Sequence, residues 1–112
     1  MARRGLMARP GVSAYVFSMI RHIVFFTLKN PGETAAVVEK LKRLGTIPGS
    51  TLFQVRANSK ADQIGNDIDI VVYSEFPDLA ALKAYKKHPT YAEVTAEVRP
   101  LRELRFAADV EI

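Results

Sequence analysis

The chain has 112 residues and no cysteine, which leaves room for one domain and excludes disulfides, thiolate nucleophiles and cysteine metal sites. Its formal net charge is +4, but residues 1–18 hold three arginines and no acid, so 13 basic residues face 12 acidic ones from Met19 onward. A domain this close to neutral lacks the basic surface that binds a phosphate backbone, which argues against a nucleic-acid partner.

The first 18 residues differ in composition from the rest of the chain. They are basic and then mildly apolar, but Pro10 and Gly11 interrupt the apolar run and no Ala-x-Ala cleavage site follows. The run is too short to cross a bilayer, so we expect no membrane partner. We expect residues 1–18 to be a disordered tail or the product of an upstream start, ahead of a domain over residues 19–112. Without disulfides to stabilise it in an oxidising environment, the sequence predicts a cytoplasmic protein.

The first predicted element is a strand over residues 21–29, rich in β-branched and aromatic side chains. Both of its faces are apolar: one carries His22, Val24, Phe26 and Leu28, the other Ile23, Phe25 and Thr27. Residues 34–44 then have helical periodicity, and Gly45 stands where a helix end favours a left-handed residue. A Pro-Gly turn leads into a second strand over residues 51–57, and a polar connection over residues 58–66 follows.

Residues 67–74 predict the third strand, with Asp67 and Asp69 on the same face. Two acids at this spacing are compatible with paired carboxylates, but a solvent-facing acidic entrance to the strand is the simpler interpretation. The two histidines are 66 positions apart with no acid nearby at ligand spacing, so the sequence predicts no metal site. The six glycines are scattered through turns and form no phosphate loop, and no Ser/His/Asp constellation is evident.

Two helices and a closing strand complete the pattern. Asp78 is predicted to cap a helix that ends at His88, because the following proline disfavours helix there. Thr90 and Glu93 have the spacing of a capping box for the next helix. Residues 104–112 alternate as the last strand. The order β-α-β-β-α-β predicts an α+β fold of the ferredoxin-like type, a four-stranded antiparallel sheet with helices on one face.

A single chain of this fold would leave apolar side chains of the sheet exposed to water. One face carries Ile23, Phe25, Val71 and Tyr73, and the opposite face carries His22 and its apolar neighbours. Whichever face the helices cover, a patch of large apolar side chains therefore remains exposed on the other. An exposed patch of this kind costs about 25 cal/mol per Å² of burial forgone and promotes aggregation. We therefore expect a homodimer, sheet against sheet about a two-fold axis, although tolerated surface residues are the alternative.

Four strings in order resemble one protein family, the stress-responsive dimeric α/β-barrel (Dabb) family. They are Met19-Ile20-Arg21-His22-Ile23-Val24, Ile47-Pro48-Gly49, Asp69-Ile70-Val71-Val72-Tyr73-Ser74-Glu75-Phe76 running into Asp78, and Leu82-x-x-Tyr85-x-x-His88-Pro89. The resemblance spans residues 19 to about 106. It implies a homodimeric α/β barrel with a pocket between each sheet and its helices, and fold alone does not fix the chemistry.

The resemblance also implies candidate site residues. In a plant branch of the family, which cyclises linear polyketides without a cofactor, a strand-one histidine, a second-helix tyrosine and the second histidine of His-Pro-x-His line the pocket. The matching positions are His22, Tyr85 and Tyr91, with Val24, Phe26 and His88 as pocket neighbours. Tyr91 departs from the pattern, because a phenol is protonated near neutral pH and donates rather than accepts. Proton abstraction would therefore fall to His22 or His88.

Each candidate also has a purely structural interpretation. His22 could be a satisfied, partly buried strand residue, and His88 could cap the carbonyls at a helix end. The Tyr85 ring belongs to an apolar stripe, while its hydroxyl needs a partner at the pocket. We expect a homodimer that binds a small apolar ligand without a cofactor. The alternatives are a cofactor-independent cyclase, isomerase or lyase acting on a carbonyl compound, and a structural stress-associated oligomer with a filled interior.

Overall fold

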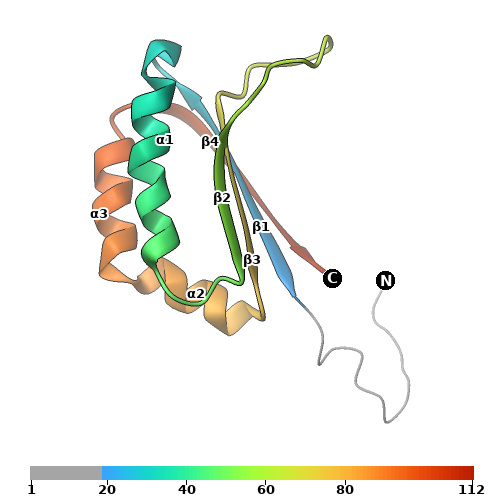
Figure 1. The fold of residues 1–112 in the computed structure, drawn as a ribbon, viewed down its shortest axis with the longest axis vertical. Helices are drawn as coiled ribbons and strands as arrows, with labels where there is room; N and C mark the ends of the chain where they lie inside the picture. The colour runs from blue at the N-terminus through green and yellow to red at the C-terminus, as the bar shows by residue number, and fades with distance from the viewer. Residues whose placement is uncertain (1–18) are drawn as a thin grey trace.

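The computed structural model describes residues 19–112, which form an antiparallel sheet with helices on one face (Figure 1). The strands lie in the order β2-β3-β1-β4 and span Leu52–Ala57, Ile70–Phe76, Ile20–Leu28 and Arg102–Glu111. The helices are α1 (Thr34–Lys42), α2 (Leu79–Lys87) and α3 (Pro89–Val98), and the 3-10 helices η2 (Pro31–Glu33) and η3 (Arg43–Thr46) flank α1. This confirms the ferredoxin-like fold. Residues 1–18, which the sequence predicts to be a tail, lie outside the described residues.

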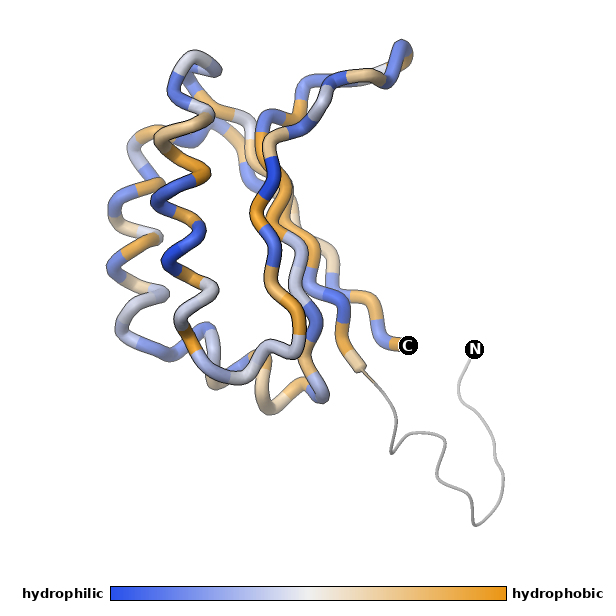
Figure 2. The backbone as a smooth tube through the Cα atoms, in the orientation of Figure 1, coloured by the Kyte–Doolittle hydropathy of each residue, from blue (hydrophilic) through white to orange (hydrophobic). Residues whose placement is uncertain are grey.

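The core lies between the inner face of the sheet and the helices. Alternation along β1 buries five inward side chains: Ile20, His22, Val24, Phe26 and Leu28. Inward residues of β3 and the apolar stripes of the helices complete it: Ile70, Val72, Phe76, Val37, Leu41, Leu82, Tyr85, Val94 and Val98. In Figure 2 the strands carry hydrophobic residues along much of their length, whereas the connection between β2 and β3 is largely hydrophilic. Burial of each large apolar side chain contributes about 1.5–3 kcal/mol, so this layer supplies most of the stability.

The junction of α2 and α3 differs from the prediction at its second cap. Asp78 caps α2 as expected, since its Oδ1 accepts a hydrogen bond from Ala81 N at 2.8 Å. His88, not Thr90, caps α3: its Nδ1 accepts from Thr90 N at 3.1 Å, and Pro89 takes the first helical position. The predicted capping box with Glu93 is therefore wrong, because proline already has the φ angle of a helix start and loses no needed N–H there.

Gly45 and Gly49 serve different purposes. The prediction of a left-handed cap at Gly45 is wrong, because the chain continues from α1 into η3 and Gly45 lies inside that 3-10 helix. What Gly45 provides is space, since a Cβ there would lie 2.8 Å from the ring of Phe53. The positive backbone angle falls instead at Gly49, with φ of +117°, in the turn ahead of β2. Side chains rarely adopt that conformation, so this turn requires glycine.

The connection between β2 and β3 is anchored by a buried acid. Strand β3 begins at Ile70, and Asp69 just before it is only 3% exposed. Its Oδ2 accepts from Leu28 N at 2.7 Å and its Oδ1 from Lys60 Nζ at 2.7 Å. Burial raises the pKa of Asp69, but the hydrogen bonds from Lys60 and Leu28 and the charge of Lys60 outweigh it, so the net pKa is lowered. The expected solvent-facing acidic entrance is wrong for Asp69, whereas Asp67 is exposed.

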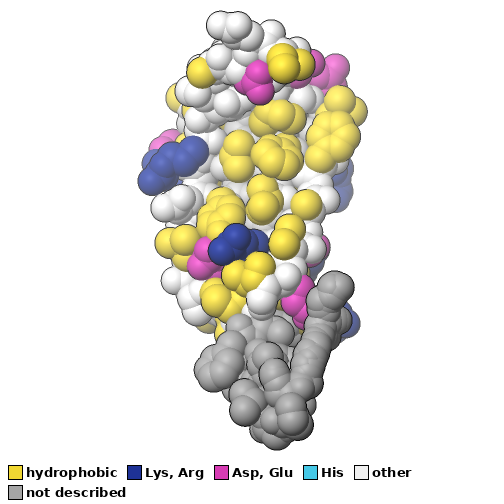
Figure 3. Space-filling model, turned by 90° about the vertical axis from the view of Figure 1, so that its right-hand side faces the viewer, with side chains coloured by type: hydrophobic (Ala, Val, Ile, Leu, Met, Phe, Trp, Pro, Cys, Tyr) yellow, Lys and Arg dark blue, Asp and Glu magenta, His cyan; other side chains and the backbone are white. Residues whose placement is uncertain are grey.

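The outer face of the sheet is uncovered in a single chain. On β4 it carries Leu104, Phe106 and Val110, which are 49%, 53% and 44% exposed. Strands β1 and β3 add half-buried apolar side chains to the same face, Ile23, Phe25, Val71 and Tyr73. Figure 3 looks onto this face and shows hydrophobic side chains along its centre, with charged groups mostly toward the sides. Both faces of β1 are therefore apolar, and only one is covered by helices.

Candidate functional site

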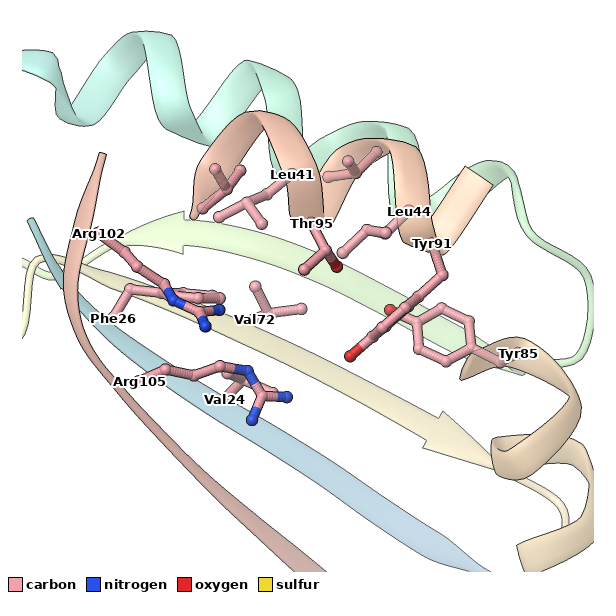
Figure 4. Close-up of a pocket in the computed structure, with 12 residues that line it drawn as sticks. Val24, Phe26, Leu41, Leu44, Val72, Tyr85, Tyr91, Thr95, Arg102 and Arg105 are labelled. Atoms are coloured by element: carbon pink, nitrogen blue, oxygen red, sulfur yellow. The ribbon is translucent and has the colours of Figure 1, made fainter. Parts of the chain in front are cut away.

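A hollow lies between the inner face of the sheet and helices α1 and α3 (Figure 4). The cavity itself has a volume of about 40 Å³, and about 430 Å³ when the open solvent at its mouth is included. Its lining comes from every layer of the fold: Val24, Phe26, Leu41, Leu44, Val72, Tyr85, Tyr91, Val94, Thr95, Val98, Arg102 and Arg105. The floor is apolar, and polar groups enter from two sides, Arg102 and Arg105 from β4 and Tyr85 and Tyr91 from the helices (Figure 4).

The periodicities of the elements explain this lining. Val24 and Phe26 are two apart on β1, so both point to the inner face of the sheet. On α3, Tyr91, Thr95 and Val98 are separated by four and three residues, so they share the helix face that covers the hollow. A sheet face and a helix face of this kind meet because both are apolar, and the hollow is the part of their interface that side chains do not fill.

Tyr85 and Tyr91 form one wall of the hollow. Their rings pack edge to face with centroids 5.3 Å apart, and Phe76 packs behind Tyr85 at 5.0 Å. Burial, and then the proximity of Tyr91, raise the pKa of Tyr85 well above its usual range, so its hydroxyl stays protonated. In Figure 4 the Tyr91 ring extends from α3 across the hollow toward Arg105. The Tyr85 hydroxyl can therefore act as a hydrogen-bond donor to a bound molecule but not as a base near neutral pH, and the Tyr91 hydroxyl offers a second donor.

Two arginines enter the hollow from β4. Arg105 lies opposite Phe26 in the register with β1, and Arg102 lies opposite Leu28. Figure 4 shows both guanidinium groups pointing into the same space beside Tyr91. Burial, followed by repulsion from Arg105 and Arg99, lowers the pKa of Arg102 below its usual value. Within residues 19–112, neither guanidinium forms an ion pair with a carboxylate.

His22 lies behind this wall, paired with an acid. Its Nδ1 is 2.5 Å from Oδ1 of Asp109 on β4, and its ring centroid is 6.4 Å from that of Tyr85. The His22 side chain is 2% exposed and the Asp109 side chain 42% exposed. Burial lowers the pKa of His22 and outweighs Asp109, which raises it, while the charges of Lys86 and Arg105 lower it further. His22 therefore favours the neutral form, and its hydrogen bond to Asp109 places an imidazole that can gain or lose a proton next to Tyr85.

Comparison with known proteins gives this architecture a family. Residues 20–112 match the model of the stress responsive A/B barrel domain, Dabb, which is almost the whole described chain. The chain belongs to the Dabb family. A Dabb family protein with a ferredoxin-like fold from Mesorhizobium loti is 30% identical, with a TM-score of 0.68, over 83% of this chain and 95% of that one.

Two further solved structures are similar to this Dabb domain. A dimeric protein of unknown function with a ferredoxin-like fold from Bacteroides fragilis is 26% identical with a TM-score of 0.70, over 84% of this chain and 96% of that one. A hydroxynitrile lyase from Passiflora edulis is 19% identical with a TM-score of 0.70, over 84% of this chain and 93% of that one. At that identity the likeness shows the fold alone. Comparison with curated proteins found no match.

The structure separates the predicted site residues of this Dabb domain into two groups. Tyr85, Tyr91, Val24 and Phe26 are brought together as lining of the hollow. His22 contacts Tyr85 from behind and is not among the residues described as lining that hollow. His88 caps α3 and is likewise absent from this lining, so its expected place in the pocket differs from its place in the structure.

Sequence reasoning missed Arg102, Arg105, Thr95 and Asp109. Alternation along the last strand did contain a signal, because it separates an apolar row from a row holding Arg105 and Asp109. By the usual rule for an antiparallel sheet, the apolar row would face the helices and the polar row would face solvent. The register shows the reverse, since Asp109 lies opposite inward-facing His22. Thr95 carries no comparable signal, because a threonine four residues after Tyr91 is ordinary in a helix.

Residues 19–112 contain neither a metal cluster nor a membrane-spanning helix. No group of three or more His, Cys, Asp or Glu side chains there is placed to hold a metal ion. No helix in that part of the chain is both long enough and apolar enough to span a bilayer.

Proposed function

We propose that this Dabb domain works as a homodimeric barrel and binds a small molecule in the hollow between its sheet and α3. The observation that carries the proposal is the orientation of β4. Its apolar row, with Leu104, Phe106 and Val110, faces away from the helices, while Arg105 and Asp109 face inward. A strand of one isolated domain has the opposite arrangement, with apolar residues inward and polar residues in water. Strand β4 therefore fits a fold with a partner outside and a polar site inside.

The partner that best fits the outer face is a second copy of the chain. The patch runs across adjacent strands, with Phe25 opposite Phe106 and next to Val71 in register. An apolar sheet face of this kind can pair with its own copy about a two-fold axis, so that each copy buries the patch of the other. The Bacteroides fragilis protein with the same fold is described as dimeric, which supports this choice.

The dimer is tested by sedimentation velocity at micromolar concentration. The wild-type chain is expected to sediment with twice the mass of one chain, and Phe106→Asp with the mass of one, because a carboxylate in the buried patch loses its hydration. Leu79→Asp is the matched control, since Leu79 is 49% exposed on α2, and Phe106 is 53% exposed on β4. A monomeric wild type, or equal dissociation of both variants, would refute the dimer.

Ligand binding follows from the character of the hollow. An apolar floor with a few converging polar groups is typical of small-molecule sites. The Tyr85 hydroxyl supports this function, because that residue is 1% exposed and its side chain makes no hydrogen bond to another of residues 19–112. A buried hydroxyl without a partner costs about 1–3 kcal/mol, which a bound molecule would recover.

Native mass spectrometry of the protein purified from cell extract tests binding directly. The wild type is expected to retain a small molecule, and Thr95→Trp to lose it, because an indole on that face of α3 fills the hollow. Circular dichroism shows whether the variant keeps its helices. Retention of the same mass by a folded Thr95→Trp would place the molecule elsewhere and refute this site.

Catalysis on a carbonyl compound is a second candidate function, favoured by the buried His22–Asp109 pair beside Tyr85. In a lyase, isomerase or cyclase of this type, His22 would exchange a proton and the tyrosine hydroxyls would hold the carbonyl oxygen. The Passiflora edulis protein of this fold is named a hydroxynitrile lyase. Turnover of β-polyketones and cyanohydrins by wild type and His22→Ala tests it, and equal rates would remove His22 from any mechanism.

A further inference from the structure

The two arginines of the hollow occupy positions that a regular strand could not give them. Arg102 and Arg105 are three residues apart, and an odd spacing places side chains on opposite faces of a sheet. The register with β1 shifts between Thr27 and Leu28, where Leu104 pairs with Thr27 and Arg102 with Leu28. Glu103 is therefore an extra residue, a β-bulge that turns Arg102 onto the same inner face as Arg105.

The bulge is held by specific contacts. The Thr27 hydroxyl accepts a hydrogen bond from Leu104 N at 3.0 Å and donates one to Oε1 of Glu103 at 3.2 Å. Thr27 is only 7% exposed whereas Glu103 is exposed, so both bonds are partly buried, and together they help to fix the local geometry. Bulges of this kind often re-aim a side chain beside a functional site. Here the side chain that is re-aimed is a guanidinium, and it is directed at a second one.

Nothing in the described chain neutralises this pair of charges. Neither Arg102 nor Arg105 makes an ion pair within residues 19–112, and residues 1–18 contain no Asp or Glu. The nearest acids along β4 form hydrogen bonds elsewhere, Asp109 with His22 and Glu103 with Thr27, and neither forms an ion pair with Arg102 or Arg105. Two half-buried cations over an apolar floor repel one another, which is costly unless an anion lies between them.

We propose that Arg102 and Arg105 bind the oxyanion head of a small amphipathic ligand, a carboxylate or a phosphate monoester, whose apolar body lies against Val24, Phe26 and Val72. A guanidinium presents a planar fork of N–H donors that matches two oxygens of such a group. The Tyr91 hydroxyl, which extends toward Arg105, adds a neutral donor (Figure 4). The size of the hollow favours a compact molecule over a nucleotide or a lipid. This inference rests on the proposed binding function and names its ligand class.

Isothermal titration of the full-length chain with hexanoate, hexyl phosphate and neutral hexan-1-ol tests the charge requirement. At least one of the two anions is expected to bind about tenfold or more tightly than the alcohol, because a charged hydrogen bond is worth at least one factor of ten. Affinity for the anion is expected to fall as salt is raised, while affinity for the alcohol does not. The tighter anion identifies which of the two head groups fits the arginine pair.

Variants separate the head-group site from the apolar pocket. Arg102→Gln and Arg105→Gln are each expected to weaken the anion about tenfold or more and to leave hexan-1-ol unchanged. Arg99→Gln is the control, since Arg99 is exposed and carries the same charge next to the site without lining it. Thermal melts separate binding from stability. If the arginines repel one another, removing one should keep or raise the melting temperature, whereas a purely structural role for the pair predicts a lower one.

The outcomes that overturn the inference differ from those that overturn the function. Equal affinity for alcohol and anions, unchanged in Arg105→Gln, refutes the oxyanion site but leaves an apolar binding pocket. A lower melting temperature in both arginine variants with unchanged anion affinity assigns the pair to stability and also refutes the site. Failure of all three compounds to bind, together with no retained molecule in the native protein, refutes the binding function itself.

Discussion

Replacement of Asp69 by alanine should be among the most destabilising changes of a charged residue in this domain. Asp69 is 3% exposed, and its two carboxylate oxygens join three segments of the chain. Oδ2 accepts from Leu28 N in β1, Oδ1 accepts from Lys60 Nζ in the long connection, and Asp69 N donates to Phe26 O at 2.9 Å. Only the backbone bond survives the substitution, so the end of β1 and the connection lose their shared anchor.

The magnitude follows from the groups left behind. A hydrogen bond to a charged acceptor contributes about 1.5–3 kcal/mol, and an orphaned buried N–H costs about 1–3 kcal/mol. These two terms overlap for Leu28 N, so Asp69→Ala should lower the free energy of unfolding by about 3 kcal/mol. Asp69→Asn keeps an oxygen for Leu28 N but turns an amide N–H donor toward Lys60 Nζ, so it loses the charged hydrogen bond to Lys60 alone, and its loss should be about half as large. Asp67→Ala is the matched control, because Asp67 is exposed two residues away.

Urea unfolding at 25 °C and pH 7, at one fixed protein concentration, measures these differences. The pKa of Asp69 is lowered in the folded state, so its stabilising effect is complete above the unfolded pKa of about 3.9 and is lost as pH falls through the folded value. The gap between wild type and Asp69→Ala should therefore narrow below about pH 4. Equal losses in Asp69→Ala and Asp67→Ala, or a gap that grows in acid, would refute the anchor.

Further substitutions test the site and the turn. By ¹⁵N NMR, the imidazole of His22 should titrate below its usual pKa. Asp109→Asn should lower that pKa further, because Asp109 is the group that raises it. An upward shift of the His22 pKa in Asp109→Asn would contradict the pairing. Since burial favours neutral His22, wild-type stability should fall as pH drops below about 6.5, and His22→Gln should lose that slope. Gly49→Ala should cost about 1–3 kcal/mol because of the positive φ, whereas Gly65→Ala, with open space around it, should unfold at the same urea concentration as wild type. Tyr85→Phe should keep or raise the melting temperature, because it removes a buried hydroxyl without a partner among the described residues; a clear loss would reveal a hidden bond.

The sequence predicted the architecture because its strongest patterns are local. The alternation in residues 21–29 and the cap at Asp78 each depend on neighbours along the chain, and both appear in the structure as expected. The errors occur where two local rules compete. At His88 and Thr90 either residue could cap α3, and the fixed φ of Pro89 decides for His88. At Gly45 a small residue marks a helix end, but the contact that requires it is with Phe53, eight positions away.

The sequence predicted only some of the residues of the candidate site. Family resemblance pointed to Tyr85 and Tyr91, which line the hollow, and to His22, which lies one layer behind. Arg102 remained hidden because its direction depends on the bulge at Glu103, and a bulge is a mismatch between two paired strands. No pattern within one strand reveals it.

The amino-acid sequence by itself determined the order of elements, the apolar character of both faces of β1, and therefore the need for a cover on the outer face. Those properties depend on side-chain type and on periodicities of 2 and 3.6 residues, which the chain carries locally. The tertiary structure alone decided which row of β4 faces inward, that Asp69 is an anchor, and that Arg102 joins Arg105 over an apolar floor. These depend on how strands and loops pair across the chain, and such pairing is a relation between segments 41 or more positions apart, Leu28 with Asp69 and His22 with Asp109, which no local pattern records.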